Sequence, residues 1–231
     1  MAAVADAWMP GAGRVECSFT PEGPFHGGAP RAVWRTTESD PAALTARATA
    51  ERLDSEGRTA HLVWNPLTGE TVQLLPATAP ASGELPGDGT DHAHEGRTCV
   101  IVAVVGRAQE PFTDGPLTGV EAILRWLAVW EVARAWPPGP PPPFATPVRD
   151  PAAERAWGRS GHFGASQVPG SAEHGPGAID VHRLLDAARE RPRARLSGPR
   201  GRPAPLQEGQ EGTAHPEAAQ GALSESYALG R

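Results

Sequence analysis

The chain has 231 residues and a formal net charge of −6 at pH 7, and its basic residues are all arginines. This length predicts one domain, or one domain with a tail. Nucleic acids and anionic membranes are held by a basic face, so an acidic chain does not favour either as a partner. The two cysteines have no zinc-finger spacing and predict no disulfide framework.

The first residues of the chain have neither the basic nor the apolar region of a secretion signal. No apolar run approaches the roughly 20 residues that span a bilayer. We therefore expect a soluble protein in the cytoplasm, although export by another route stays open. Cys99 opens an apolar run and is expected to be a buried free thiol.

Residues 1–28 are rich in Gly and Pro and are expected to be irregular. The stretch RAVWRT (31–36) predicts a strand, because it contains β-branched and aromatic residues. Asp40 and Pro41 predict the start of a helix, with aspartate as the N-cap and proline in the first turn. Gly57 is the expected end of that helix.

The second set of predicted elements begins with a hairpin, whose strands are AHLVWN (60–65) and ETVQLL (70–75) around the loop PLTG. A long loop rich in Gly, Pro and His follows at 76–98. The continuously apolar stretch CVIVAVV (99–105) predicts a strand buried on both faces. His92 and His94 form an H-x-H pair with no third ligand in view, so we expect them in a solvated loop.

Thr118 and Glu121 predict a capping box at the start of a helix. One face of this helix is expected to be buried, because apolar residues recur at helical spacing: Val120, Ile123, Leu124, Leu127 and Trp130. The proline-rich stretch 137–143 predicts a stiff connector, and 178–190 predicts a final helix. Residues 191–231 have too few large apolar side chains to fold and are expected to be a disordered tail, which leaves 29–190 as the domain.

Four stretches of this domain resemble the type-2 N-acetylmuramoyl-L-alanine amidases, which are zinc enzymes related to the peptidoglycan recognition proteins. The resemblance is greatest to members from actinobacteria and actinophages. It implies an α/β domain with a mixed central sheet flanked by helices. The stretches follow the family's order, and the last, which contains GHFGASQVPGSAEHGPG, is the most specific: 29–41, 60–78, 95–116 and 158–185.

In that family two histidines and an Asp or Cys hold the zinc, and a Glu on the central strand assists the attacking water. The resemblance places the two histidine positions at Arg35 and Ala165, the Asp position at Gly175 and the Glu position at Ala103. Arginine stays protonated and offers no lone pair, and the other three residues have no ligand atom or base. We therefore expect no zinc cofactor and no catalysis, which is the pattern of a pseudoenzyme. A metal site rebuilt from His61, His162 and His174 stays open as an alternative.

The resemblance then implies a module that binds peptidoglycan or a muropeptide without cutting it. Arg35 would hold a carboxylate of the stem peptide in bidentate fashion. Other candidate ligand-binding residues line the family's groove: Thr36, Thr37, His61, His162, Ser166, Gln167 and His174. Two alternatives remain. One is an active amidase that cleaves the bond between the lactyl group of N-acetylmuramic acid and L-alanine. The other is a scaffold for protein partners, with no glycan ligand.

Overall fold

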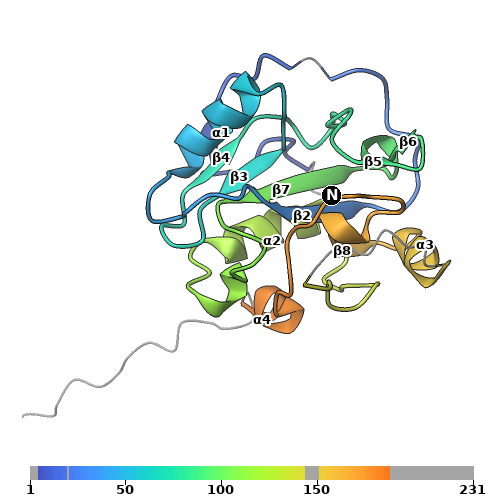
Figure 1. Cartoon of the computed structure of the whole chain (residues 1–231). Coiled ribbons are helices and arrows are strands. Elements are labelled where there is room, and N and C mark those ends of the chain that lie inside the picture. The colour runs from blue at the N-terminus through green and yellow to red at the C-terminus, as the bar shows by residue number, and fades with distance from the viewer. Residues whose placement is uncertain (1–4, 20, 144–150, 188–231) are drawn as a thin grey trace, which may run out of the picture. The chain divides into compact units, whose positions relative to one another are not determined.

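The computed structural model describes residues 5–19, 21–143 and 151–187. The predicted tail at 191–231 lies outside the described residues. Within them the chain is an α/β domain with a mixed sheet between helices, as the sequence predicted (Figure 1). The helices are α1 (Ala46–Ser55), α2 (Val120–Val129), α3 (Pro151–Trp157) and α4 (Val181–Asp186).

The central sheet has six strands in the order β1-β4-β3-β7-β2-β8. β2, β3, β7 and β8 run parallel, whereas β4 is antiparallel to β3 and parallel to β1. β5 and β6 form a separate small hairpin. The bounds are β1 Gly13–Arg14, β2 Arg31–Thr36, β3 Leu62–Trp64, β4 Thr71–Gln73, β5 Pro86–Gly87, β6 Thr90–Asp91, β7 Cys99–Val104 and β8 Gly161–Gly164.

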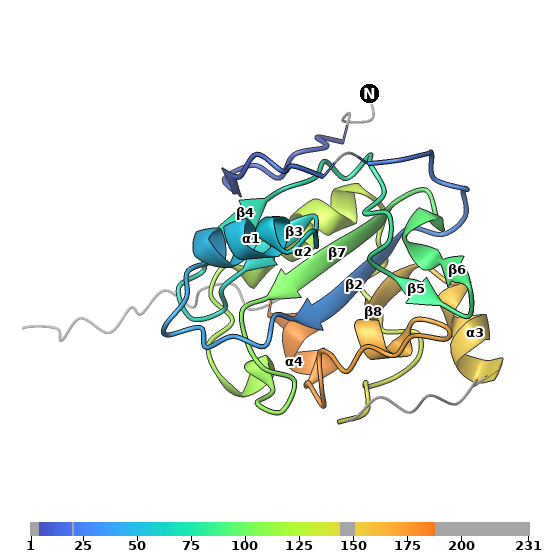
Figure 2. The same ribbon diagram turned by 45° about the horizontal axis from the view of Figure 1, so that its top comes forward.

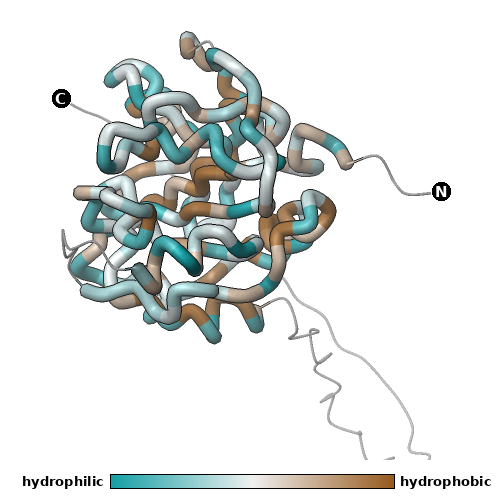
Figure 3. Tube along the Cα trace, turned by 90° about the vertical axis from the view of Figure 1, so that its right-hand side faces the viewer, coloured by the Kyte–Doolittle hydropathy of each residue, from teal (hydrophilic) through white to brown (hydrophobic). Residues whose placement is uncertain are grey.

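The strands at the centre are buried on both faces, so the domain has two apolar layers. β7 lies beside β2 in the middle of the sheet, and all of its residues are buried (Figure 2). Because side chains alternate along a strand, Trp34 faces the layer that contains α2 and α4, while Val33 faces the layer that contains α1 and Trp157 of α3. Hydrophobic segments accordingly run through the interior of the molecule in Figure 3.

The predicted start of α1 is wrong by several residues. The helix begins at Ala46, where the side chain of Thr45 accepts a hydrogen bond from the N–H of Ala48. The carbonyls of Pro41 and Leu44 accept instead from the side-chain amide of Asn65, so Asp40 and Pro41 form only a turn. The predicted end is confirmed: Gly57 has a φ of 70°, and the next N–H bonds back to Leu53, which is a Schellman motif.

The predicted capping box of α2 is also wrong. Gly119, with a φ of 80°, takes the N-cap position, and no side chain caps the helix. Thr118 is held by the β3–β4 hairpin instead, because its carbonyl accepts from the indole of Trp64 at 2.8 Å. Glu121 pairs with Arg125 one turn along the helix. The buried face of α2 is as predicted, except that Trp126 is buried where Trp130 is only partly so.

Several short elements lie where irregular chain was expected. β1 falls within 1–28, and the loop 76–98 contains β5, β6 and a 3₁₀ turn at His92–His94. β8 falls within the last resemblance stretch. The final helix, α4, begins at Val181, later than predicted, and ends at Asp186. The last predicted residues, 188–190, lie outside the described residues. No helix in the described part of the chain is long and apolar enough to cross a membrane.

Candidate functional site

The four positions that the resemblance assigned to the metal and its base come together at the carboxyl end of β2. Arg35 of β2 pairs in register with Ala103 of β7. Ala165 directly follows β8, whose last residue, Gly164, pairs with Trp34. A Cβ atom at Gly175 would lie 3.4 Å from the Cα of Arg35. Residues separated by up to 140 positions in the chain are thus neighbours in one place.

Gly175 leaves no room for a larger residue. An added Cβ would lie 2.9 Å from the backbone nitrogen of Thr36 and 3.0 Å from its Oγ1. The carbonyl of Gly175 accepts a 2.8 Å hydrogen bond from the N–H of Ser166. The segment around Gly175 is therefore packed directly onto the end of β2, in the space that a ligand side chain at this position would need.

The side chain of Arg35 is held within the protein. It is 2% exposed, and its Nη1 lies 2.5 Å from Oε2 of Glu84. Its Nη2 donates to the carbonyl of Thr59 at 2.6 Å, and the N–H of Thr59 donates to the other oxygen of Glu84 at 2.6 Å. The three residues form a closed ring of charge-assisted hydrogen bonds. The carboxylate that we expected a ligand to bring to Arg35 comes from Glu84 of the same chain.

These residues do not fit a zinc ion. Zinc needs three deprotonated N, O or S donors and one open position, and the four converged residues offer no such donor. Arg35 already has its hydrogen-bond partners, and Gly175 has no space for a side chain. Among residues 5–19, 21–143 and 151–187, no group of three His, Cys, Asp or Glu side chains lies close enough together to hold a metal.

His61 and His162 are buried parts of the framework. Nδ1 of His61 accepts from the N–H of Ile101, and its Nε2 lies 2.9 Å from the carbonyl of Ala79. Nδ1 of His162 accepts from the indole N–H of Trp34 at 3.0 Å. Burial lowers the pKa of His61 to about 4 and that of His162 to about 3. Both rings are thus neutral at pH 7. Within the described part of the chain, His61, His162 and His174 do not come close enough together to hold a metal.

Two further predicted ligand residues, Ser166 and Gln167, follow Ala165 in a 3₁₀ turn. Oε1 of Gln167 accepts from the indole of Trp136 and from the N–H of Gly164, and its Nε2 donates to the carbonyl of Gly139. Gln167 therefore holds two segments together and is not open to a ligand. The Ser166 hydroxyl is buried and has no hydrogen-bond partner within the described residues.

The other predicted residues, Thr36, Thr37 and His174, line one pocket of about 590 Å³. This volume lies within the roughly 300–1,000 Å³ that is usual for small-ligand sites. We call it the Thr36 pocket. Its lining comes from the end of β2, from the chain that follows α1, β7 and α2, and from the segment before Pro176: Thr36, Thr37, Glu38, Arg58, Ala108, Gln109, Pro143, Ala172, Glu173, His174 and Gly175.

Three charged residues of this pocket were not among the predicted site residues: Glu38, Arg58 and Glu173. Glu38 has a φ of 52°, a conformation that non-glycine residues rarely adopt and that clusters at binding sites. Arg58 lies just beyond Gly57, where the end of the Schellman motif fixes its backbone. The sequence pattern that predicted the helix end could have pointed to Arg58. The sequence around Glu38 does not show that its carboxylate accepts a hydrogen bond from the N–H of Ala108, 70 residues away.

His92 and His94 differ from expectation. His92 is 8% exposed, and its ring contacts Trp157 edge-on. His94 stacks on His26, and its Nε2 lies 3.5 Å from Asp91. The loop therefore packs against α3 and the N-terminal segment.

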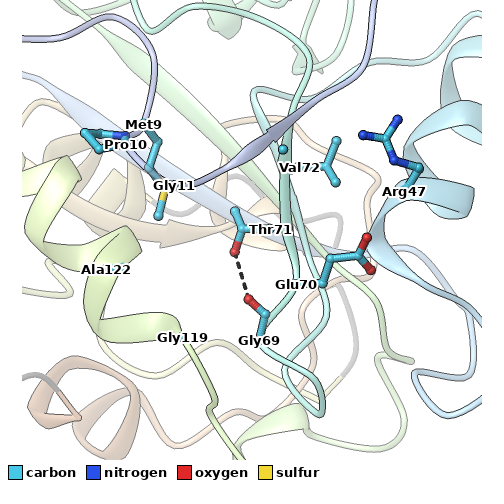
Figure 4. A pocket seen from close by; sticks show the side chains of 11 residues that line it. Met9, Pro10, Gly11, Arg47, Gly69, Glu70, Thr71, Val72, Gly119 and Ala122 are labelled. Carbon is cyan, nitrogen blue, oxygen red and sulfur yellow. Dashed lines mark hydrogen bonds between the residues drawn. The ribbon is translucent and has the colours of Figure 1, made fainter.

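A second, smaller pocket of about 340 Å³ lies at the β1–β4 edge of the sheet. Met9, Pro10 and Gly11 border it on one side, with Arg47 of α1 and Glu70 on the other (Figure 4). It contains none of the residues that the resemblance singled out. The Thr36 pocket is therefore the better candidate site.

Comparison with solved structures supports the fold independently. The hydrolase AmiA of Staphylococcus aureus, solved with its ligand, matches with a TM-score of 0.53 and 11% identity, over 78% of this chain and 82% of that one. The chain has the amidase-2 fold. At this identity the likeness shows the fold alone. No protein-family model and no curated protein matches the sequence.

Two further solved structures are similar at lower scores. The N-acetylmuramoyl-L-alanine amidase LysCS from Clostridium intestinale has a TM-score of 0.44 and 14% identity, over 78% of this chain and 96% of that one. A selenomethionine derivative of AmpD has a TM-score of 0.41 and 17% identity, over 77% of this chain and 94% of that one.

Proposed function

We propose that the chain binds a peptidoglycan or muropeptide fragment in the Thr36 pocket and does not hydrolyse it. The amidase-2 fold supports the ligand class, since AmiA and LysCS are named as a hydrolase and an N-acetylmuramoyl-L-alanine amidase. Fold alone does not fix function, so the proposal depends on the site.

One observation carries the proposal. The four positions assigned to zinc and its base converge, yet Arg35 is paired with Glu84 and Gly175 is packed against Thr36. These four residues offer no donor for the zinc ion that would activate water and polarise the amide carbonyl. The pocket directly beside these positions is still open, because Thr36 and Gly175 also line it. A pocket that can bind a ligand therefore remains beside the positions where the zinc donors and the base are missing.

Titration of the full chain with a muropeptide that contains the lactyl–alanine amide tests this proposal. Gln109 is exposed and lines the pocket, so Gln109→Trp should fill the pocket and abolish binding without affecting folding. Glu110→Trp is the matched control, because Glu110 is exposed, adjacent and not part of the lining. Absence of binding by the unmodified chain would contradict the proposal and favour a scaffold for protein partners. Equal binding by the two variants would place the ligand elsewhere.

A further inference from the structure

The Thr36 pocket has charges of both signs on its walls. Arg58 supplies one positive charge, and Glu38 and Glu173 supply two negative charges. The three residues come from separate segments: Arg58 from the chain after α1, Glu38 from the chain after β2 and Glu173 from the chain before Gly175. A pocket with this lining complements a ligand that carries a cation and an anion of its own.

The ion pair within the pocket is weak and can be exchanged. Nη2 of Arg58 lies 3.7 Å from Oε1 of Glu173, beyond hydrogen-bond distance, and the two side chains are 44% and 39% exposed. Such surface pairs contribute little to stability. A ligand carboxylate that reached Arg58 with two short hydrogen bonds would replace Glu173 at little cost. Glu173 would then be available to a cation.

Glu38 presents a carboxylate in a fixed position. Its Oε1 accepts hydrogen bonds from the hydroxyl of Thr36 at 2.5 Å and from the N–H of Ala108 at 3.1 Å. The backbone of Glu38 is left-handed, with a φ of 52°. Because both bonds go to the same oxygen, Oε2 keeps its capacity to accept from a ligand ammonium group.

We propose that the Thr36 pocket binds the zwitterionic end of a short peptide, with Arg58 holding its carboxylate and Glu38 and Glu173 holding its ammonium group. This inference rests on the proposed function, because it specifies which part of the cell-wall fragment enters the pocket. The sugar then lies outside the pocket, and the ionised peptide end sets the specificity.

The test uses calorimetric titration of the full chain with three forms of one muropeptide, whose peptide ends in a residue with a free ammonium and a free carboxylate. The second form has that carboxylate amidated, the third has the ammonium acetylated, and the same peptide without sugar is a fourth probe. The variants are Arg58→Gln and Glu173→Gln. Arg47→Gln is the control, because Arg47 makes an equally long exposed pair, 3.7 Å to Glu51, at the other edge of the sheet.

We expect amidation to weaken binding to the unmodified chain by about tenfold or more, the change for one lost charge-assisted contact. Arg58→Gln should weaken the free form by a similar factor and remove the discrimination against the amidated form. Glu173→Gln should likewise weaken binding of the free form and remove the discrimination against the acetylated form. Arg47→Gln should bind like the unmodified chain.

The outcomes separate the two proposals. Equal affinity for all three forms, with no effect of Arg58→Gln, would overturn the zwitterion inference and leave the proposed function standing. If the sugar-free peptide bound with the same dependence on Arg58 while the muropeptides did not bind, the inference would be supported and a cell-wall ligand would be overturned. Absence of binding by every probe would overturn both.

Discussion

Arg35 and Glu84 form a buried ion pair, 2.5 Å between Nη1 and Oε2, at the place that the resemblance assigns to a zinc ligand. The pair ties the carboxyl end of β2 to the loop between β4 and β5 and encloses the backbone of Thr59. A positive charge thus remains at this end of the sheet, but it belongs to a side chain and is already neutralised. The guanidinium of Arg35 therefore has its anionic partner within the chain and needs none from a ligand.

Breaking this pair should strongly destabilise the fold. Glu84→Ala leaves the buried charge of Arg35 without a counterion and leaves its Nη1 and the N–H of Thr59 without their acceptor, so we expect a loss of about 3–5 kcal/mol in the free energy of unfolding. The double variant Arg35→Met/Glu84→Leu should lose clearly less stability than the sum of the losses in Arg35→Met and Glu84→Leu alone, as urea denaturation would measure. Arg97→Gln is the control, because its pair with Glu131 is exposed. Additive losses would contradict this role of the pair.

Gly175→Ala should destabilise the chain by about 1–3 kcal/mol, the usual effect of overpacking. The new methyl group would come within 2.9 Å of the backbone nitrogen of Thr36, which β2 holds in place. Gly115→Ala is the matched control, since its nearest contact would be an ordinary 3.8 Å. Thermal denaturation of both variants checks this, and equal stability of the two would contradict the close packing.

The free energy of unfolding should decrease as the pH is lowered below about 6.5. Burial lowers the pKa of His61 and His162 from 6.5 to about 4 and about 3, so the unfolded chain binds protons that the folded chain does not. The stabilisation is complete above pH 6.5 and is lost as the pH falls toward these values, by up to about 1.4 kcal/mol per pH unit for each histidine.

Urea denaturation between pH 7.5 and pH 4.5 measures this slope. In His162→Asn, the amide oxygen can still accept from the indole of Trp34, but the group no longer titrates. The slope should therefore be shallower in this variant. An identical slope would show that His162 is not the group responsible.

The two cysteines should differ in reactivity. Both are free, but Cys99 is fully buried, and burial raises its pKa to about 12. Cys17 is partly exposed, although burial also raises its pKa. A thiol reagent at pH 8 should modify only Cys17 in the folded chain and both cysteines in urea. The variant Cys17→Ser should then show no reactive thiol before unfolding, and reaction of Cys99 in the folded state would contradict its placement.

Much of the fold could be predicted from local sequence. β2, β7 and the β3–β4 hairpin have the apolar and β-branched residues of buried strands, and the structure confirms them. The expectation that Cys99 is a buried free thiol is confirmed as well. β8 was missed because its residues, GHFG, have little strand preference of their own. It forms because its backbone pairs with β2, which is a tertiary effect.

The site could be predicted only in part. The resemblance located Thr36, Thr37 and His174, which do share a pocket. It could not show that Glu84, 49 residues from Arg35, takes the position of a ligand carboxylate. His61, His162 and Gln167 were expected in the groove and are instead internal hydrogen-bonding groups. The sequence alone does not show whether a polar side chain forms its hydrogen bonds with a ligand or with another part of the chain.

The central claim is that this fold binds a cell-wall fragment without cutting it. The most direct measurement is the mass of a muropeptide with an intact lactyl–alanine amide, followed over time with the full chain and added zinc. The account predicts a bound ligand of unchanged mass at every zinc concentration. Separate sugar and peptide products that increase with zinc would contradict it and establish an active amidase.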